Sequence, residues 1–225
     1  MTTPVFIFGA GPQGRVVLDI LRSSNAVVAG FLDDRATSSD REVSGLRILN
    51  AGDWLASDRP GAVVVAIGHN RVRMDVGNRI VAAGRHLHTA IHRSVVIGGD
   101  VEIGAGSVCM MGAAVATGCR LGVNVVVNSG VTLDHDSIVE DGAYLAPGVH
   151  TAGAVRIGAR AFIGAGAILG PSVTIAHDAI VGAGSVVLND IPANALAFGA
   201  PARVQRTLDG DADWSRILGG RRAGQ

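Results

Sequence analysis

Residues 95–124 read VVIGGDVEIGAGSVCMMGAAVATGCRLGVN, and this six-residue rhythm continues without interruption to about residue 190. Steps of six from Ile97 to Val187 reach an apolar residue at every position except Thr151. A helix period of 3.6 and plain strand alternation both fail to produce strict sixes over such a length. A hexapeptide register is typical of a parallel β-helix, in which each coil stacks on the previous one and buries one aliphatic side chain per face.

Three hexads in each coil make a triangular prism, which sets the geometry of the whole repeat. Residues 18 apart should lie above one another, roughly 4.8 Å apart along the axis. Glycine, asparagine and aspartate recur between the short strands, where we expect the corners. Thr151 is the polar residue of the inward column, and we expect its hydroxyl to satisfy a backbone carbonyl.

Composition excludes several classes of protein. The 225 residues carry 19 basic and 19 acidic side chains, so nothing indicates a nucleic-acid partner. The first residues lead directly into a strand-like run without a signal-peptide pattern. No apolar run approaches the length of a membrane span. Cys109 lies in the inward column and, like Cys119, is interpreted as a small hydrophobic residue, which favours a cytoplasmic protein without structural disulfides.

Residues 1–92 show a different pattern, which predicts a Rossmann-like domain. We expect buried strands at residues 5–8, 26–32 and 62–67, with helices at 15–21 and 70–83. The ends of the three strands should meet at one carboxyl edge, where open α/β sheets bind ligands. Residues 93–206 would form the β-helix domain. The tail from Pro192 to Arg203 leaves the repeat and should cap the open end of the prism, and residues 207–225 form a polar extension.

The loop after the first strand matches G-x-G-x-x-G, with two acids about 20 residues further on. That pattern alone predicts NAD, but a domain of about 90 residues has room for only half of a dinucleotide fold. Backbone N–H groups at a helix N-terminus suit a phosphate or pyrophosphate, so we favour a nucleotide diphosphate over a ligand-free turn. The candidate residues are Gly9, Gly11, Pro12, Gln13, Gly14, Asp33, Asp34 and Gly68.

One corner of the prism carries candidate catalytic residues. His135 lies two residues past the inward Leu133, Asp136 follows it, and Gly153 should stack on His135 one coil later. An imidazole, a carboxylate beside it and a nearby backbone N–H can serve as general base, orienting group and oxyanion donor. The spacing therefore predicts acyl transfer. A merely solvated corner histidine remains an alternative, since corners of solenoids are usually polar.

A zinc site held by three histidines is a further alternative. It needs a second histidine five residues away on the same corner, but positions 130 and 140 are Gly and Glu. We therefore expect no metal. A third column of small or flat residues, 18 apart, predicts a shallow groove for a thin arm such as phosphopantetheine; its members are Pro147, Ala165 and Ala183.

Both halves together resemble a known family over nearly the whole length. The resemblance rests on five segments: residues 9–14 (GAGPQG), 31–34 (FLDD), 66–70 (AIGHN), 128–136 (NSGVTLDHD) and 199–203 (GAPAR). The chain resembles the bacterial nucleotide-amino-sugar N-acetyltransferases of the hexapeptide-repeat superfamily, grouped with sialic acid O-acetyltransferase-like proteins. It departs from the family pattern at Pro12 and Gln13, where Gly and His are usual, and at Asp136, where Glu is frequent.

The resemblance implies a left-handed β-helix, acetyl-CoA as co-substrate and a homotrimer with each site between two prisms. It makes His135 the base, Asp136 its partner, Gly153 N–H the oxyanion donor and Asn128 a ligand of the sugar amine or of a neighbouring sugar hydroxyl. The glycine loop, with Asp33, Asp34 and Gly68, would hold the nucleotide. The residues expected at acetyl-CoA are Tyr144, Gly153, Ala165, Ala183 and Arg203.

Three other functions stay open at this point. The acceptor could be a hydroxyl, as in sialic acid O-acetylation, because a hydroxyl also needs a base. The prism could serve only to assemble a nucleotide-binding trimer without catalysis. The glycine loop could belong to an NAD oxidoreductase.

Overall fold

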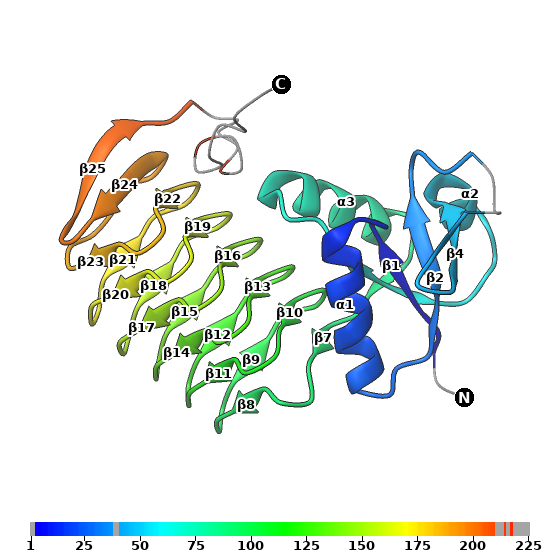
Figure 1. The fold of residues 1–225 in the computed structure, drawn as a ribbon, viewed down its shortest axis with the longest axis horizontal. Coiled ribbons are helices and arrows are strands. Elements are labelled where there is room, and N and C mark those ends of the chain that lie inside the picture. Colours follow the sequence, from blue (N-terminus) through cyan, green and yellow to red (C-terminus); the bar gives the residue numbers. More distant parts are fainter. Residues whose placement is uncertain (1–2, 38–40, 210–213, 215–216, 218–225) are drawn as a thin grey trace.

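The computed structural model describes residues 3–37, 41–209, 214 and 217. It contains an α/β domain followed by a prism of short parallel strands, which lie side by side in Figure 1. The two expected architectures are therefore confirmed. Among the described residues, no helix is long and apolar enough to cross a membrane.

The N-terminal sheet has six strands in the order β3-β4-β2-β1-β5-β6. Alternate residues of β1 face opposite sides, so Val5 and Ile7 pack with α1, whereas Phe6 and Phe8 pack with α2 and α3. This places one helix on one face of the sheet and two on the other. The strands are β1 Val5–Phe8, β2 Val28–Asp33, β3 Glu42–Val43, β4 Leu46–Asn50, β5 Ala62–Val65 and β6 His86–Leu87; the helices are α1 Pro12–Ser23, α2 Ala51–Ala56 and α3 Asn70–Ala82.

The three predicted strands and two predicted helices are all present, with shifted ends. Helix α1 begins three residues earlier than expected, at Pro12, because proline fits the first turn of a helix, where its missing N–H is not needed. The elements β3, β4 and α2 were not predicted. They are too short for an apolar period to identify, and the side chain of Asn50 caps α2 by accepting from Asp53 N–H at 3.1 Å.

The prism has three faces, each built from strands that pair in parallel with partners 18 residues away, such as Val108 with Val126. The first face holds β7 Ala90–Ile91, β10 Val108–Cys109, β13 Val126–Val127, β16 Tyr144–Leu145, β19 Phe162–Ile163 and β22 Ile180–Val181. The second face holds β8 Val96–Ile97, β11 Ala114–Val115, β14 Thr132–Leu133, β17 His150–Thr151, β20 Ile168–Leu169 and β23 Val186–Val187. The third face holds β9 Glu102–Ile103, β12 Arg120–Leu121, β15 Ile138–Val139, β18 Arg156–Ile157 and β21 Thr174–Ile175.

The second residue of each strand points into the prism, as the six-residue register predicts. From Cys109 onward these side chains form one continuous buried core. Burial raises the pKa of Cys109 to about 12, so this thiol behaves as a small hydrophobic group. The expected hydrogen bond from Thr151 to a backbone carbonyl is not the one observed. The Thr151 hydroxyl accepts from Asp134 N–H at 3.1 Å instead of donating to a carbonyl.

The outer side of the first face is covered by the N-terminal domain. Val108, Val126 and Phe162 share one buried cluster with residues of α1. Only His88 and Thr89 separate β6 of the N-terminal sheet from β7 of the prism. Ala90–Ile91 therefore already pairs with the prism, three residues before residue 93, where the β-helix was expected to begin.

The tail leaves the six-residue register, as expected, and forms a hairpin of β24 Ala195–Gly199 and β25 Ala202–Thr207. β24 pairs in parallel with β22, so the hairpin extends the first face and covers its last strand edge.

Candidate functional site

His135 lies on the corner between the second and third faces, next to two acids. Its Nδ1 is 2.9 Å from Asp136 Oδ2, and its backbone N–H donates to Asp134 Oδ1 at 2.8 Å. The imidazole is about half exposed. With Nδ1 held by a carboxylate, the neutral ring carries its proton there, which leaves Nε2 free to accept one.

The acids also change how readily His135 holds a proton. The hydrogen bond that the ring donates to Asp136, followed by the charge of Asp134, raises the pKa of His135 above its ordinary value of 6.5. A more basic imidazole is a stronger proton acceptor once neutral. Asp136 adopts a left-handed backbone conformation, with φ of +58°.

Gly153 lies one coil above His135, as the 18-residue spacing predicts. A Cβ built on Gly153 would be 2.6 Å from both Nε2 and Cε1 of His135. Glycine at this position therefore leaves room for the imidazole. Within the described chain, no partner for Gly153 N–H is recorded, which suits an oxyanion donor. The structure brings these three predicted catalytic residues together.

Asn128 lies on another corner, between the first and second faces. Its side chain is largely buried; Nδ2 donates to Tyr144 Oη at 2.9 Å, and Oδ1 accepts from Ser129 N–H at 2.8 Å. Tyr144 is only 6% exposed; it stacks on Phe162 and lies beside Trp214 and the Arg73 guanidinium. The expected acetyl-CoA contact of Tyr144 stays a prediction, and in one chain its hydroxyl contacts Asn128.

Ala165 and Ala183 also lie on this corner, in the column that starts at Pro147. Gly166 N–H donates to Pro147 O at 2.9 Å, and Gly184 N–H donates to Ala165 O at 2.8 Å, so the column is stacked as expected. Arg203 lies on β25, with its Nη1 donating to Ala202 O. The acetyl-CoA contacts of these residues stay predictions.

The glycine loop occupies the carboxyl edge of the N-terminal sheet. A Cβ on Gly14 would lie 2.0 Å from Gly9 O, a severe clash, so the helix can approach the strand only because this residue is glycine. Gly11, the N-cap of α1, has open space where a Cβ would point. Both features suit a phosphate group near the N–H groups of this turn.

The other predicted nucleotide ligands follow strands β2 and β5, which flank β1. Asp33 accepts from Arg35 N–H at 2.9 Å, and Asp34 pairs with Arg79 at 2.8 Å. Gly68 O accepts from Trp214 Nε1 at 3.3 Å. The structure thus gathers the loop, Asp33, Asp34 and Gly68 on one edge, while their binding of a nucleotide stays a prediction.

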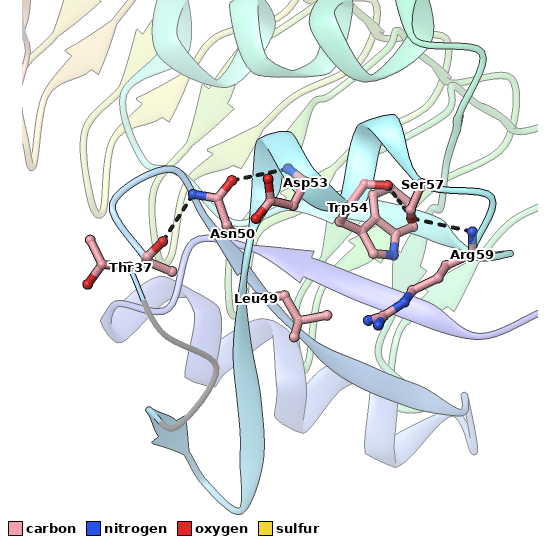
Figure 2. A pocket seen from close by; sticks show the side chains of 8 residues that line it. Thr37, Leu49, Asn50, Asp53, Trp54, Ser57 and Arg59 are labelled. Carbon is pink, nitrogen blue, oxygen red and sulfur yellow. Dashed lines mark hydrogen bonds between the residues drawn. The ribbon is translucent and has the colours of Figure 1, made fainter.

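A cavity of about 340 Å³ beside α2 was not predicted from the sequence. Figure 2 shows its lining side chains, which come from the loop after β2, the end of β4, and α2 with its following loop. The N-cap pattern at Asn50 and Asp53 was the available signal for this helix. The lining residues are Ala36, Thr37, Leu49, Asn50, Asp53, Trp54, Ser57 and Arg59.

The sheet edge that carries the predicted nucleotide ligands, called the nucleotide edge below, and the candidate base His135 are not brought together within one chain. The N-terminal domain covers the first face, whereas His135 lies on the corner between the other two faces. In a triangular prism that corner is opposite the first face. No cluster of three or more metal-ligating side chains occurs among the described residues.

Comparison with known families identifies both domains. A PglD N-terminal domain model matches residues 4–80. A bacterial transferase hexapeptide model (six repeats) matches residues 154–189, and a hexapeptide repeat of succinyl-transferase matches residues 117–147. A putative acetyltransferase of Staphylococcus aureus strain COL is 41% identical over 64 residues, which is 28% of this chain and 32% of that protein. The chain thus matches about a third of the length of this curated relative.

Longer similarities cover nearly the whole chain. GDP-perosamine N-acetyltransferase of Escherichia coli O157:H7 is 29% identical over 201 residues, covering 86% of this chain and 82% of that protein. PerB from Caulobacter crescentus, solved with CoA and GDP-perosamine, is 35% identical with a TM-score of 0.84, over 90% of this chain and 97% of that one.

The acetyltransferase domain of PglB from Neisseria gonorrhoeae FA1090 is 32% identical with a TM-score of 0.84, over 90% of this chain and all of that one. These matches agree with the expected left-handed β-helix behind an α/β domain. The chain therefore belongs to the hexapeptide-repeat family of nucleotide-amino-sugar N-acetyltransferases.

Proposed function

We propose that this protein transfers an acetyl group from acetyl-CoA to the amine of a nucleotide-linked amino sugar, such as a UDP- or GDP-4-amino-deoxy sugar. The observation that carries the proposal is the His135–Asp136 pair stacked on Gly153. The similarity to PerB, whose structure contains CoA and GDP-perosamine, supports the substrate class.

The three residues can perform direct transfer. The sugar amine attacks the thioester carbonyl carbon while His135 Nε2 accepts a proton from the amine nitrogen. Gly153 N–H donates to the oxyanion that forms. When the carbon–sulfur bond breaks, the imidazolium returns its proton to the departing thiolate, so charge and atoms balance. Base assistance contributes about 10²–10⁴ in rate, and one oxyanion donor about 10²–10³.

The corner between the first and second faces suits the thin arm of acetyl-CoA. Its stacked column contains only proline and alanine at positions 147, 165 and 183, so no long side chain fills the space above it. We propose that this column, with Arg203, contacts the co-substrate.

We further propose a homotrimer, because one chain separates its nucleotide edge from its base. The outer side of the second face is largely apolar, with Val96 67% and Ile168 49% exposed. Packing this face against other copies would bury it. It would also set the corner carrying Asn128 and Ala165 of one chain beside the corner carrying His135 of the next. The two free cysteines support a cytoplasmic location.

The function can be tested by measuring release of the coenzyme A thiol with UDP- and GDP-amino sugars and with the corresponding hydroxy sugars. Transfer to the amine alone supports the proposal, and faster transfer to the hydroxyl would favour O-acetylation instead. We expect His135→Ala to lower turnover at least about a hundredfold without loss of fold. Release of coenzyme A at the wild-type rate would contradict the assignment of the base.

The composite site can be tested by complementation. Gly11→Glu places a negative charge where we expect phosphate, in open space that avoids a steric clash. This variant and His135→Ala should each show only a small residual activity alone. Co-expressed chains should regain activity, because some sites would combine an intact nucleotide edge with an intact base. Absence of recovery in verified mixed trimers would place both halves in the same chain.

A further inference from the structure

Arg73, in α3, carries a positive charge that is completely buried between the two domains. Burial lowers its pKa to about 10, so the guanidinium stays protonated at neutral pH. Removing a charge from water is costly unless hydrogen bonds replace its hydration. All six hydrogen bonds recorded for this side chain go to neutral oxygen atoms.

These hydrogen bonds tie together two distant parts of the molecule. Nη1 donates to Ile67 O at 3.0 Å and to Gly68 O at 3.2 Å, in the loop that we expect at the nucleotide. Nε donates to Asn124 O at 3.0 Å and Nη2 donates to Gly142 O at 2.6 Å, on corners of the prism. The arginine therefore fixes the nucleotide loop to the prism.

The guanidinium also contacts Tyr144, which leads to Asn128. The Arg73 Cζ atom lies 5.6 Å from the centre of the Tyr144 ring, a cation–π distance. Burial raises the pKa of Tyr144, so its hydroxyl stays neutral and can accept the 2.9 Å hydrogen bond from Asn128 Nδ2. This bond decides which way the amide faces. Its Oδ1 keeps a second lone pair for an incoming amine.

We propose that Arg73 and Tyr144 are positioning residues, which hold Asn128 in register with the nucleotide loop so that the acceptor amine is placed for transfer. The inference rests on the proposed function and on the role of Asn128 at the sugar amine, which the family resemblance implies. Only the amino-sugar substrate would depend on this relay of Gly68, Arg73, Tyr144 and Asn128. Acetyl-CoA would bind without it, so variants in the relay should affect the two substrates differently.

The sharpest variant is Tyr144→Phe, which keeps the ring that stacks on Phe162 and lies tilted beside Trp214, and removes only the hydroxyl. We expect kcat/KM for the nucleotide amino sugar to fall about tenfold, the effect of one buried hydrogen bond, with KM for acetyl-CoA unchanged. Arg73→Lys keeps the charge but loses the planar set of guanidinium donors. It should therefore also lower kcat/KM for the nucleotide amino sugar.

Arg71→Ala is the matched control. Arg71 lies on the same helix and crosses the same interface, where its Nη2 is 3.0 Å from Asp178 Oδ1, outside the relay. We expect its kinetic constants to stay close to wild type. Equal losses in Arg71→Ala and Tyr144→Phe would overturn the proposal, because the loss would then reflect the interface in general.

A double variant tests the link to Asn128. If Tyr144 acts through Asn128, adding Tyr144→Phe to Asn128→Ala should lower kcat/KM no further. A second tenfold loss, or a rise in KM for acetyl-CoA in Tyr144→Phe alone, would overturn the relay; the latter would support a direct contact of Tyr144 with the co-substrate.

If the proposed function is wrong, the kinetic result differs from the one expected when only the relay is wrong. Wild-type protein would then acetylate no nucleotide amino sugar, whatever the variants do. In that case the relay is judged by thermal unfolding. Shifts in the unfolding midpoint for Tyr144→Phe and Asn128→Ala that fail to add in the double variant support the contact, and additive shifts overturn it.

Discussion

Gly153→Ala tests the catalytic corner with a single methyl group. The new Cβ would lie 2.6 Å from His135 Nε2 and Cε1, whereas comfortable contacts between such atoms begin near 3.5 Å. The imidazole must therefore move by about 1 Å. Because Gly153 lies outside the left-handed backbone conformations, alanine adds no backbone strain, and it keeps the N–H that would stabilise the oxyanion.

The expected loss follows from that displacement. Moving the ring by about 1 Å stretches or breaks its 2.9 Å contact with Asp136 and misplaces the base. A misplacement of this size costs about 10² in rate, or about 2.7 kcal/mol in activation free energy. We expect kcat to fall about a hundredfold, with little change in the unfolding midpoint because the corner is exposed.

Gly99→Ala is the matched control for this variant. Gly99 occupies the same corner column three coils earlier, and the nearest atom to its new Cβ would be Thr117 Oγ1 at a comfortable 3.8 Å. Release of the coenzyme A thiol should be nearly unchanged in this protein. Full activity in Gly153→Ala, or an equal loss in Gly99→Ala, would refute the predicted displacement of the His135 ring.

Three further predictions concern acidity and packing. Activity should rise as pH passes through the raised pKa of His135, above 6.5, and Asp136→Asn should move that limb of the kcat/KM profile to lower pH; an unmoved limb would exclude Asp136 as the main cause. Burial opposes ionisation of Asp178, but hydrogen bonds from Arg160 and His177 outweigh it and lower its pKa, so this carboxylate stabilises the fold above its unfolded pKa near 3.8. The stability difference between wild type and Asp178→Asn should therefore shrink as pH falls through about 4 in urea titrations, and a constant difference would contradict this. Leu145→Ala empties a fully buried position and should cost about 2–5 kcal/mol in free energy of unfolding, measured in the same way, with a cost below about 1 kcal/mol counting against the assigned core.

The prism and its catalytic corner could be predicted because a repeat fixes three-dimensional neighbours by counting. Eighteen residues separate His135 from Gly153, and that number alone places one above the other. The alternating strands and helices of the first domain are also encoded locally. By contrast, β4 and α2 span five and six residues, too few for an apolar period to show.

The links between the domains could not be predicted from local patterns. In the sequence, Arg73 is one of several arginines near or within α3, and nothing nearby shows that it will be buried. Its partners Asn124 and Gly142 lie 51 and 69 residues away. Likewise, Tyr144 was expected at acetyl-CoA only through the family resemblance, and no local pattern indicates its bond to Asn128, 16 residues earlier. Such contacts depend on how two separate folds meet.

The left-handed backbone at Asp136 restricts which acid can accompany the histidine. Aspartate and asparagine tolerate that conformation through short polar side chains, whereas glutamate would pay more for the same turn. His177 and Asp178 repeat the arrangement on another corner, with φ of +56° at the aspartate. The histidine and its aspartate thus form a two-residue unit. Substituting two adjacent positions would introduce this unit into another coil whose turn is compatible.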